Sequence, residues 1–250
     1  MSTRYLGIMD WGIGGIGIYK LIKSGLPDVP VIYFSDTGVT PYGKMARQDL
    51  IARLNTVIAF LELQGVTHLV FGCNAASTVI PFLNARGMMI EGVVDSAVAV
   101  ATKMRPSRLA LIGGRRTVLS GVYRRAFAAR GIKIRQRIAQ PLSGLIESGD
   151  IDSPELRDQC RQILSPVRNC SHLLLACTHY PAITHVLTEL LDKETAVIDP
   201  AKELVKRIRV WRLPPGGTDL FFTTGDARAM KAAARTAFDL RIKSVRRAVI

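Results

Sequence analysis

The chain has 250 residues, of which 48% are hydrophobic, 22% charged and 6% aromatic, and this globular composition excludes long disorder, a collagen-like repeat and a coiled-coil rod. No run of about 18 uninterrupted apolar residues occurs, and residues 1–10 lack the apolar stretch of a signal peptide. We therefore expect no membrane span and a cytoplasmic location, and the net charge of +14 is the one unusual figure.

The elements predicted from apolar periodicity alternate between strands and helices. In the first half they are strands at 5–9, 29–34, 68–72 and 89–93 and helices at 17–24, 47–64 and 74–85. In the second half they are strands at 109–112, 132–138, 172–175 and 196–198 and helices at 118–130, 154–164 and 182–191. A last strand begins at Phe221, and a helical tail covers 226–243. This order predicts an α/β fold in which helices cover both faces of largely parallel sheets.

Two segments of the first half recur in the second half. THLVFGCN at 67–74 recurs as SHLLLACT at 171–178, an offset of 104, and LGIMDWG at 6–12 recurs weakly as LALIGGR at 109–115, an offset of 103. The nearly equal offsets predict two similar α/β lobes, which we place at 1–96 plus 210–250 and at 97–209. Residues just past the strand ends of such lobes line a ligand crevice, and both Cys73 and Cys177 have this position.

The two cysteines permit acid–base chemistry at one carbon atom. One thiolate would remove a proton from one face of the carbon, and the opposite thiol would deliver a proton to the other face. An ordinary thiol has a pKa of about 8.5, so each cysteine needs a local partner to ionise. The helix N-termini predicted after both cysteines, together with Asp10 and His179, are the candidates.

The remaining cysteines, Cys160 and Cys170, are interpreted as buried structural thiols. No Cys-x-x-Cys pair occurs, and the four histidines do not have zinc-finger spacing, so no metal site is predicted. The charge is concentrated in residues 103–137, which hold eleven Lys and Arg residues and no acid. Because these charges alternate with apolar residues at helical spacing, we interpret them as a solvated helix face and do not expect nucleic acid as the partner.

A glycine-rich segment offers a rival interpretation. GIGGIG at 12–17 follows a strand and precedes a helix, as in a dinucleotide-binding site, and Asp36 stands near the ribose-binding position. Against this interpretation, the carboxylate of Asp10 at the same turn would repel a pyrophosphate, and the recurring cysteines would have no role. We instead expect the glycines to let the backbone approach a small substrate closely.

The residues resemble the pyridoxal-phosphate-independent aspartate/glutamate racemases, and among these the glutamate racemases most closely. The resemblance covers nearly the whole chain. It is carried by GIMDWGIGG at 7–15, YFSDT at 33–37, PYG at 41–43, CNAAS at 73–77, TVLSGVY at 117–123, CTHYP at 177–181 and FTTGD at 222–226. The two cysteine motifs together are specific, whereas the glycine run alone is weak.

This resemblance implies two α/β lobes related by a pseudo-twofold axis, with the active site between them and a C-terminal tail that returns to the first lobe. It implies Cys73 and Cys177 as paired acid and base, assisted by Asp10 on one side and by Glu147 and His179 on the other. It implies no pyridoxal phosphate, nicotinamide or metal. The positions implied for binding an acidic amino acid are Pro41, Tyr42, Gly43, Asn74, Thr117 and Thr178.

The sequence departs from the family pattern at two binding positions, where Trp11 replaces a serine and Ala75 replaces a threonine. The loss of two hydroxyls should alter specificity, and the bulk of Trp11 favours aspartate over the longer glutamate. Two alternatives stay open, namely a decarboxylase or isomerase of the same fold and a nucleic-acid- or anion-binding protein that uses the basic surface. The oligomeric state also stays open, with a homodimer as one alternative.

Overall fold

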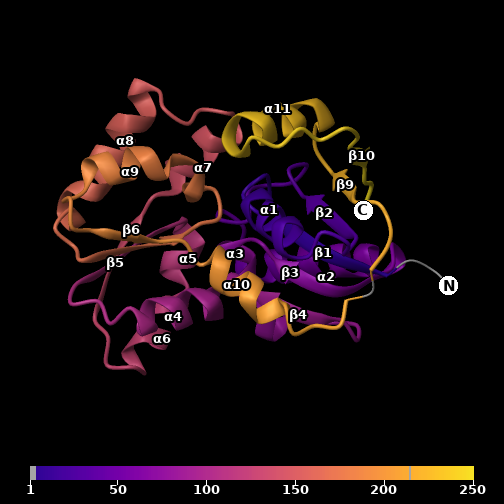
Figure 1. Cartoon of the computed structure of the whole chain (residues 1–250), viewed down its shortest axis with the longest axis horizontal. Helices are drawn as coiled ribbons and strands as arrows, with labels where there is room; N and C mark the ends of the chain where they lie inside the picture. Colours follow the sequence, from indigo (N-terminus) through magenta and orange to yellow (C-terminus); the bar gives the residue numbers. More distant parts are fainter. Residues whose placement is uncertain (1–3, 214) are drawn as a thin grey trace.

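The computed structural model describes residues 4–213 and 215–250, which form two β-sheets whose paired strands are all parallel (Figure 1). The first sheet has the order β10-β9-β2-β1-β3-β4, and the second has the order β6-β5-β7-β8. The strands of the first sheet are β1 (Tyr5–Asp10), β2 (Val31–Ser35), β3 (Val66–Phe71), β4 (Met89–Gly92), β9 (Leu220–Thr223) and β10 (Arg246–Arg247). Those of the second are β5 (Leu109–Gly113), β6 (Ile134–Ile138), β7 (His172–Ala176) and β8 (Ala196–Ile198).

The second sheet repeats the order of four strands of the first. Strands β2-β1-β3-β4 correspond to β6-β5-β7-β8, and the register agrees, because Met9 pairs with Phe71 as Ile112 pairs with Leu175. The two similar α/β lobes predicted from the recurring segments are thus confirmed. The C-terminal strands β9 and β10 extend only the first sheet, so the tail returns to the first lobe as expected.

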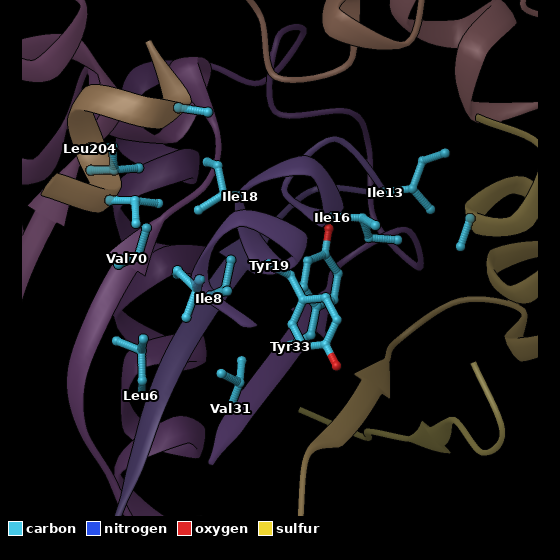
Figure 2. Close-up of a cluster of buried hydrophobic side chains, with 14 of the residues drawn as sticks. Leu6, Ile8, Ile13, Ile16, Ile18, Tyr19, Val31, Tyr33, Val70 and Leu204 are labelled. Carbon is cyan, nitrogen blue, oxygen red and sulfur yellow. The ribbon is translucent and has the colours of Figure 1, made fainter. Parts of the chain in front are cut away.

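Helices cover both faces of the first sheet. Along β1, Ile8 packs into one hydrophobic layer and Met9 into the other, as the alternation of a strand requires. The layer around Ile8 is drawn in Figure 2. Its helices are α1 (Ile16–Gly25), α10 (Ala201–Ile208) and α11 (Ala227–Phe238), whereas α2 (Arg47–Leu63) covers the opposite layer.

The second sheet is covered in the same way. Ile112 packs into one hydrophobic layer and the neighbouring Leu111 into the other. The first of these layers holds α7 (Gln140–Glu147), α8 (Pro154–Leu164) and α9 (Thr184–Leu190). The second holds α4 (Val93–Lys103), α5 (Arg115–Leu119) and α6 (Val122–Ala128).

Two helices pack against the sheet of the opposite lobe. Helix α4 follows β4 of the first sheet, yet its Ala97 lies in a layer of the second sheet. Helix α10 follows β8 of the second sheet, yet its Leu204 lies in the layer shown in Figure 2. The two helices contact each other near the middle of Figure 1. The predicted lobe boundaries at 96/97 and 209/210 stay a proposal. Residues 201–208, which that division assigns to the second lobe, pack with the first sheet.

Two predicted helices are interrupted, each for a local reason. The helix expected at 74–85 ends after α3 (Asn74–Ser77), where the Ser77 hydroxyl donates to the Cys73 carbonyl at 2.8 Å. Pro81, which has no N–H, then lies in a short 3₁₀ turn. The helix expected at 118–130 is divided into α5 and α6 by Gly121, whose φ of +70° is accessible to glycine.

Other elements of the structure have different bounds from those predicted, or were not predicted. The tail helix α11 stops before Asp239, which has a φ of +47°, and does not continue to residue 243. Helices α4, α7 and α10 were not predicted, and the segment expected to begin a helix at 182 first forms a 3₁₀ turn (Tyr180–Ile183). None of the helices in the described ranges is long and apolar enough to cross a membrane.

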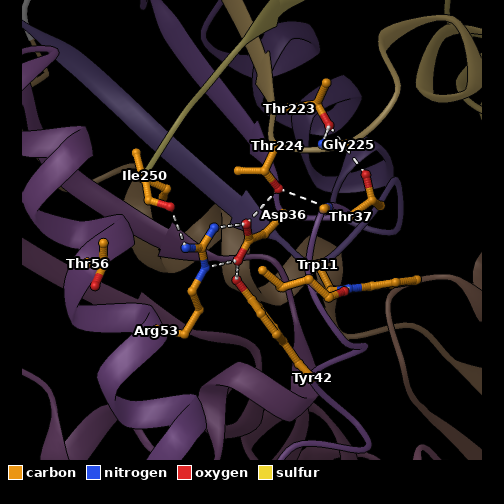
Figure 3. Close-up of polar contacts among 12 residues, drawn as sticks. Trp11, Asp36, Thr37, Tyr42, Arg53, Thr56, Thr223, Thr224, Gly225 and Ile250 are labelled. Carbon is orange, nitrogen blue, oxygen red and sulfur yellow. Dashed lines mark hydrogen bonds and ion pairs between the residues drawn. The ribbon is translucent and has the colours of Figure 1, made fainter.

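The buried carboxylate of Asp36, at the end of β2, joins four parts of the first lobe (Figure 3). Arg53 of α2 donates to it through Nε at 2.9 Å and through Nη2 at 2.6 Å. The hydroxyl of Tyr42 donates to it at 2.6 Å, and the hydroxyl of Thr224 donates to it at 2.8 Å. Arg53 also donates to the carbonyl of Ile250 at 3.0 Å. Both oxygens of Asp36 are thus engaged within the protein, so Asp36 holds the loop around Tyr42 and is not available as a ribose-binding acid.

Replacement of Asp36 by asparagine should lower the free energy of unfolding by about 3 kcal/mol or more, because Arg53 would lose its counter-charge at a largely buried position. Asp158→Asn is the matched control, since it breaks the exposed pair of Asp158 with Arg161 and should cost about 1 kcal/mol or less. Urea unfolding of the two variants measures both values. Equal losses would contradict the structural role of Asp36.

Candidate active site

A cavity of about 360 Å³ lies between the lobes at the carboxyl ends of the central strands. Strand β1 ends at Asp10, β3 leads to Cys73, and β7 leads to Cys177. The cavity therefore occupies the crevice position expected of such sheets. Of the residues predicted for the site, only Glu147 does not line the cavity. Those that line it are Asp10, Trp11, Pro41, Tyr42, Gly43, Cys73, Asn74, Ala75, Thr117, Cys177, Thr178 and His179.

The first lobe contributes a buried carboxylate and a buried thiol. One oxygen of Asp10 accepts from the Trp11 N–H at 2.7 Å, and the other accepts from the Gly15 N–H at 2.8 Å. Burial raises the pKa of Asp10, although the nearby His179 partly offsets this effect. Burial and the adjacent Asp10 charge raise the pKa of the Cys73 thiol well above its ordinary value. Cys73 therefore holds its proton firmly in the free protein.

The second lobe contributes a connected series of three groups. His179 Nδ1 lies 3.7 Å from Cys177 Sγ, and His179 Nε2 lies 2.7 Å from Glu147 Oε2. Burial alone would lower the pKa of His179, but the hydrogen bonds to Cys177 and Glu147 raise it well above the ordinary value. These hydrogen bonds therefore favour the protonated form of His179, whose Nδ1 faces Cys177. Glu147, though outside the cavity lining, acts on the site through His179.

The glycine-rich turn after β1 packs against the second lobe. The N–H of Ile13 donates to Glu147 Oε2 at 3.0 Å. A Cβ atom on Gly12 would overlap the Glu147 carboxylate, and one on Gly14 would lie 2.5 Å from His179 Nδ1 and 2.6 Å from Thr178 Oγ1. The glycines thus allow the lobes to approach each other and leave no space for a pyrophosphate. Residues 12–17 are not among the described residues that line the cavity, although Gly14 lies against three that do, and our expectation that this backbone approaches the substrate stays a prediction.

The effect of helix N-termini on the two thiols is smaller than expected: a backbone hydrogen bond from Ala76 lowers the pKa of Cys73, but burial and the Asp10 charge raise it more. The helix after Cys73 is the single turn α3, and Cys177 is followed by two further residues before a 3₁₀ turn begins at Tyr180. Neither segment is long enough to develop a large dipole. Burial and Asp10 therefore set the pKa of Cys73, and His179 is the ionisable side chain beside Cys177.

The cavity also contains residues that sequence reasoning missed. Lys44 follows the PYG motif directly, and it is the only Lys or Arg among the described residues that line the cavity. Gln140 and Ser143, in the first half of α7, line the cavity from the second lobe. Proximity to a motif could have identified Lys44, but helix α7 was not predicted. Within residues 4–213 and 215–250, no group of three His, Cys, Asp or Glu side chains could hold a metal ion.

The cavity wall contains the two residues that depart from the family pattern. Trp11 and Ala75 both line it, as expected from their motifs. The indole N–H of Trp11 donates to the Val39 carbonyl at 3.0 Å, so the ring is held in one orientation. The Tyr42 hydroxyl is directed to Asp36. This part of the wall is therefore largely apolar.

Comparison with known proteins identifies the class of enzyme. The profile of the Asp/Glu/Hydantoin racemase family matches residues 6–208. A glutamate racemase of Desulforudis audaxviator is 31% identical over 255 residues, covering 94% of this chain and 93% of that protein. The crystal structure of a glutamate racemase of Thermus thermophilus with β-chloro-D-alanine is 28% identical, with a TM-score of 0.85 over 99% of this chain and 97% of that chain.

A further solved structure supports the fold alone. The glutamate racemase of Bacillus anthracis superposes with a TM-score of 0.90 over 100% of this chain and 99% of that chain, at 23% identity. The chain therefore belongs to the Asp/Glu/Hydantoin racemase family and is an enzyme of the amino-acid racemase class.

The pKa of Cys73 is directly measurable through its rate of alkylation by iodoacetamide, followed by mass spectrometry of the Cys73 peptide. We expect a midpoint above the ordinary value of about 8.5, and Asp10→Asn should lower it because the neighbouring negative charge is removed. Cys160 is an internal control, since burial raises its pKa to about 11 and Asp10 is not among the causes. An unchanged Cys73 midpoint in the variant would contradict the role of Asp10.

Proposed function

We propose that the protein is a pyridoxal-phosphate-independent racemase that interconverts the L- and D-forms of an acidic amino acid, with aspartate favoured over glutamate. One observation carries this proposal. Cys73 and Cys177 come from different lobes, line the same cavity, and each has its own ionisable partner. A decarboxylase of this fold would need only one of the two thiols. The cytoplasmic location and the homodimer stay predictions.

In the proposed reaction, one thiolate takes the α-hydrogen of the amino acid as a proton, so that an S–H bond forms while the C–H bond breaks. The electron pair stays on the α-carbon and is delocalised into the α-carboxylate. The opposite thiol then gives its proton to the other face of the same carbon, which inverts its configuration. The two cysteines have now exchanged thiol and thiolate, and the reverse reaction uses them in opposite roles.

The partners of the two cysteines support an unequal resting state. Burial and Asp10 favour the protonated form of Cys73, whereas Cys177 Sγ lies 3.7 Å from Nδ1 of His179. The two thiols therefore have unlike surroundings, as an acid and a base on opposite faces of one carbon require. In this account Glu147 keeps His179 charged and oriented.

Donors for both substrate carboxylates lie in the cavity wall. Asn74, Thr117 and Thr178 are buried polar residues of the cavity, and they are the proposed partners of the α-carboxylate. Asp10 is the proposed partner of the α-ammonium group. Because the Trp11 and Tyr42 side chains direct their polar atoms elsewhere, Lys44 is the proposed partner of the side-chain carboxylate.

The preference for aspartate rests on Trp11 and Ala75. The relatives compared above are named glutamate racemases, so the preference does not come from them. The indole of Trp11 occupies space where a serine would leave room, and Ala75 removes a hydroxyl group. A shorter substrate fits such a wall with less crowding. One methylene is worth about 1–3 kcal/mol in a pocket, which allows a preference of about 10- to 200-fold.

Substitution of either cysteine tests the two-thiol mechanism. Cys73→Ala and Cys177→Ala should each reduce kcat for racemisation by more than the 10²–10⁴-fold typical of one acid–base group, because inversion needs both a donor and an acceptor. Cys160→Ala, which lies outside the cavity, is the matched control and should retain activity. Near-normal racemisation by either cavity variant would contradict the mechanism.

Substrate preference tests the role of the cavity wall. The ratio of kcat/KM for aspartate to that for glutamate should favour aspartate in the wild type and should fall in a Trp11→Ser, Ala75→Thr double variant. The reason is that the variant regains space and two hydroxyl groups. A wild type that prefers glutamate would contradict the proposed preference for aspartate. An unchanged ratio in the double variant would contradict the proposed role of Trp11.

A further inference from the structure

One hydrogen bond between the lobes joins Asn74, a predicted site residue, to Tyr123, which was not predicted to act in the site. Tyr123 lies in α6 of the second lobe, and its hydroxyl donates to Asn74 Oδ1 of the first lobe at 2.6 Å. Tyr123 is fully buried and Asn74 is 3% exposed. Asn74 lines the cavity, whereas Tyr123 does not, so Tyr123 lies behind the binding surface.

The amide group of Asn74 is only half satisfied. An asparagine side chain has an oxygen that accepts hydrogen bonds and an NH₂ group that donates two. The oxygen is taken by Tyr123, but Nδ2 is buried and has no hydrogen-bond partner among the described residues. A buried donor of this kind is unfavourable unless a ligand supplies an acceptor. The missing acceptor fits a carboxylate.

The orientation of this amide depends on Tyr123. The Tyr123 hydroxyl has no other hydrogen bond within the described ranges, so its proton goes to Asn74 Oδ1. A rotated amide would leave that proton without an acceptor, and it would turn Oδ1 toward the negative charge of a bound carboxylate. The tyrosine ring is itself held in place, because it stacks on Phe127 with centroids 6.3 Å apart in the core of the second lobe.

We propose that Tyr123 is a positioning residue that presents Asn74 Nδ2 to the α-carboxylate of the substrate. This inference rests on the proposed function, since it takes an amino acid as the ligand. Because the bond joins the two lobes, the donor is oriented only when α6 and the segment after Cys73 are in contact. Lobe arrangement and carboxylate binding are thus coupled through one hydroxyl group.

The Tyr123→Phe variant tests this proposal because it removes the hydroxyl and keeps the ring. Because the donor binds the α-carboxylate already in the ground state, KM for the preferred amino acid should rise about 10-fold or more. The value of kcat should fall as well, since the carboxylate gains negative charge as the α-proton leaves. Tyr19→Phe is the matched control, since that hydroxyl donates to Asp219 at 2.8 Å outside the cavity. It should leave KM unchanged.

A double-variant cycle separates positioning from a general structural effect. Asn74→Ala should raise KM, and adding Tyr123→Phe should then raise it no further. A rise of the same size in both backgrounds, or an unchanged KM in Tyr123→Phe alone, would overturn the proposal. If the wild type racemises neither aspartate nor glutamate, the proposed function fails instead. Calorimetric titration with each amino acid then compares the wild type and Tyr123→Phe, and equal affinities overturn the inference.

Discussion

The carboxylate of Glu147 joins the two lobes at the site, and the geometry of the cleft depends on this contact. It accepts from the backbone N–H of Ile13 at 3.0 Å in the first lobe, and it lies 2.7 Å from His179 Nε2 in the second. A carboxylate that is only 15% exposed needs such partners. The contact is possible only because Gly12 has no side chain to overlap Glu147. Sterics and electrostatics therefore set the separation of the lobes together.

This close approach places two thiols in opposite electrostatic surroundings. Cys177 faces an imidazolium that Cys177 and Glu147 keep protonated, whereas Cys73 faces the Asp10 carboxylate at a buried position. One fold duplicated along the chain thus yields two sites that are alike in backbone position and unlike in charge. A reaction that needs a base and an acid at once requires this inequality. The duplication supplies the positions, and the neighbouring side chains supply the difference.

The sequence predicts the backbone of the site better than its surroundings. Cys73 and Cys177 were found because a strand pattern and a recurring motif are both local, and parallel strands bring their carboxyl ends to one edge. The structural role of Asp36 was not predicted, because it depends on Arg53, Tyr42 and Thr224, which are brought together only by folding. The exchange of α4 and α10 between lobes and the bond from Tyr123 to Asn74 are long-range contacts that no local periodicity reveals.

The central claim is that two separate thiols act on opposite faces of one carbon, and racemisation in deuterium oxide tests it most directly. Aspartate or glutamate of one configuration is incubated with the enzyme, and both enantiomers are analysed early in the reaction. We expect the product enantiomer to carry deuterium at the α-carbon, because its proton comes from a thiol that has exchanged with solvent. The remaining starting enantiomer should keep its hydrogen. Equal early deuteration of both enantiomers would show a single base serving both faces, and it would contradict the account.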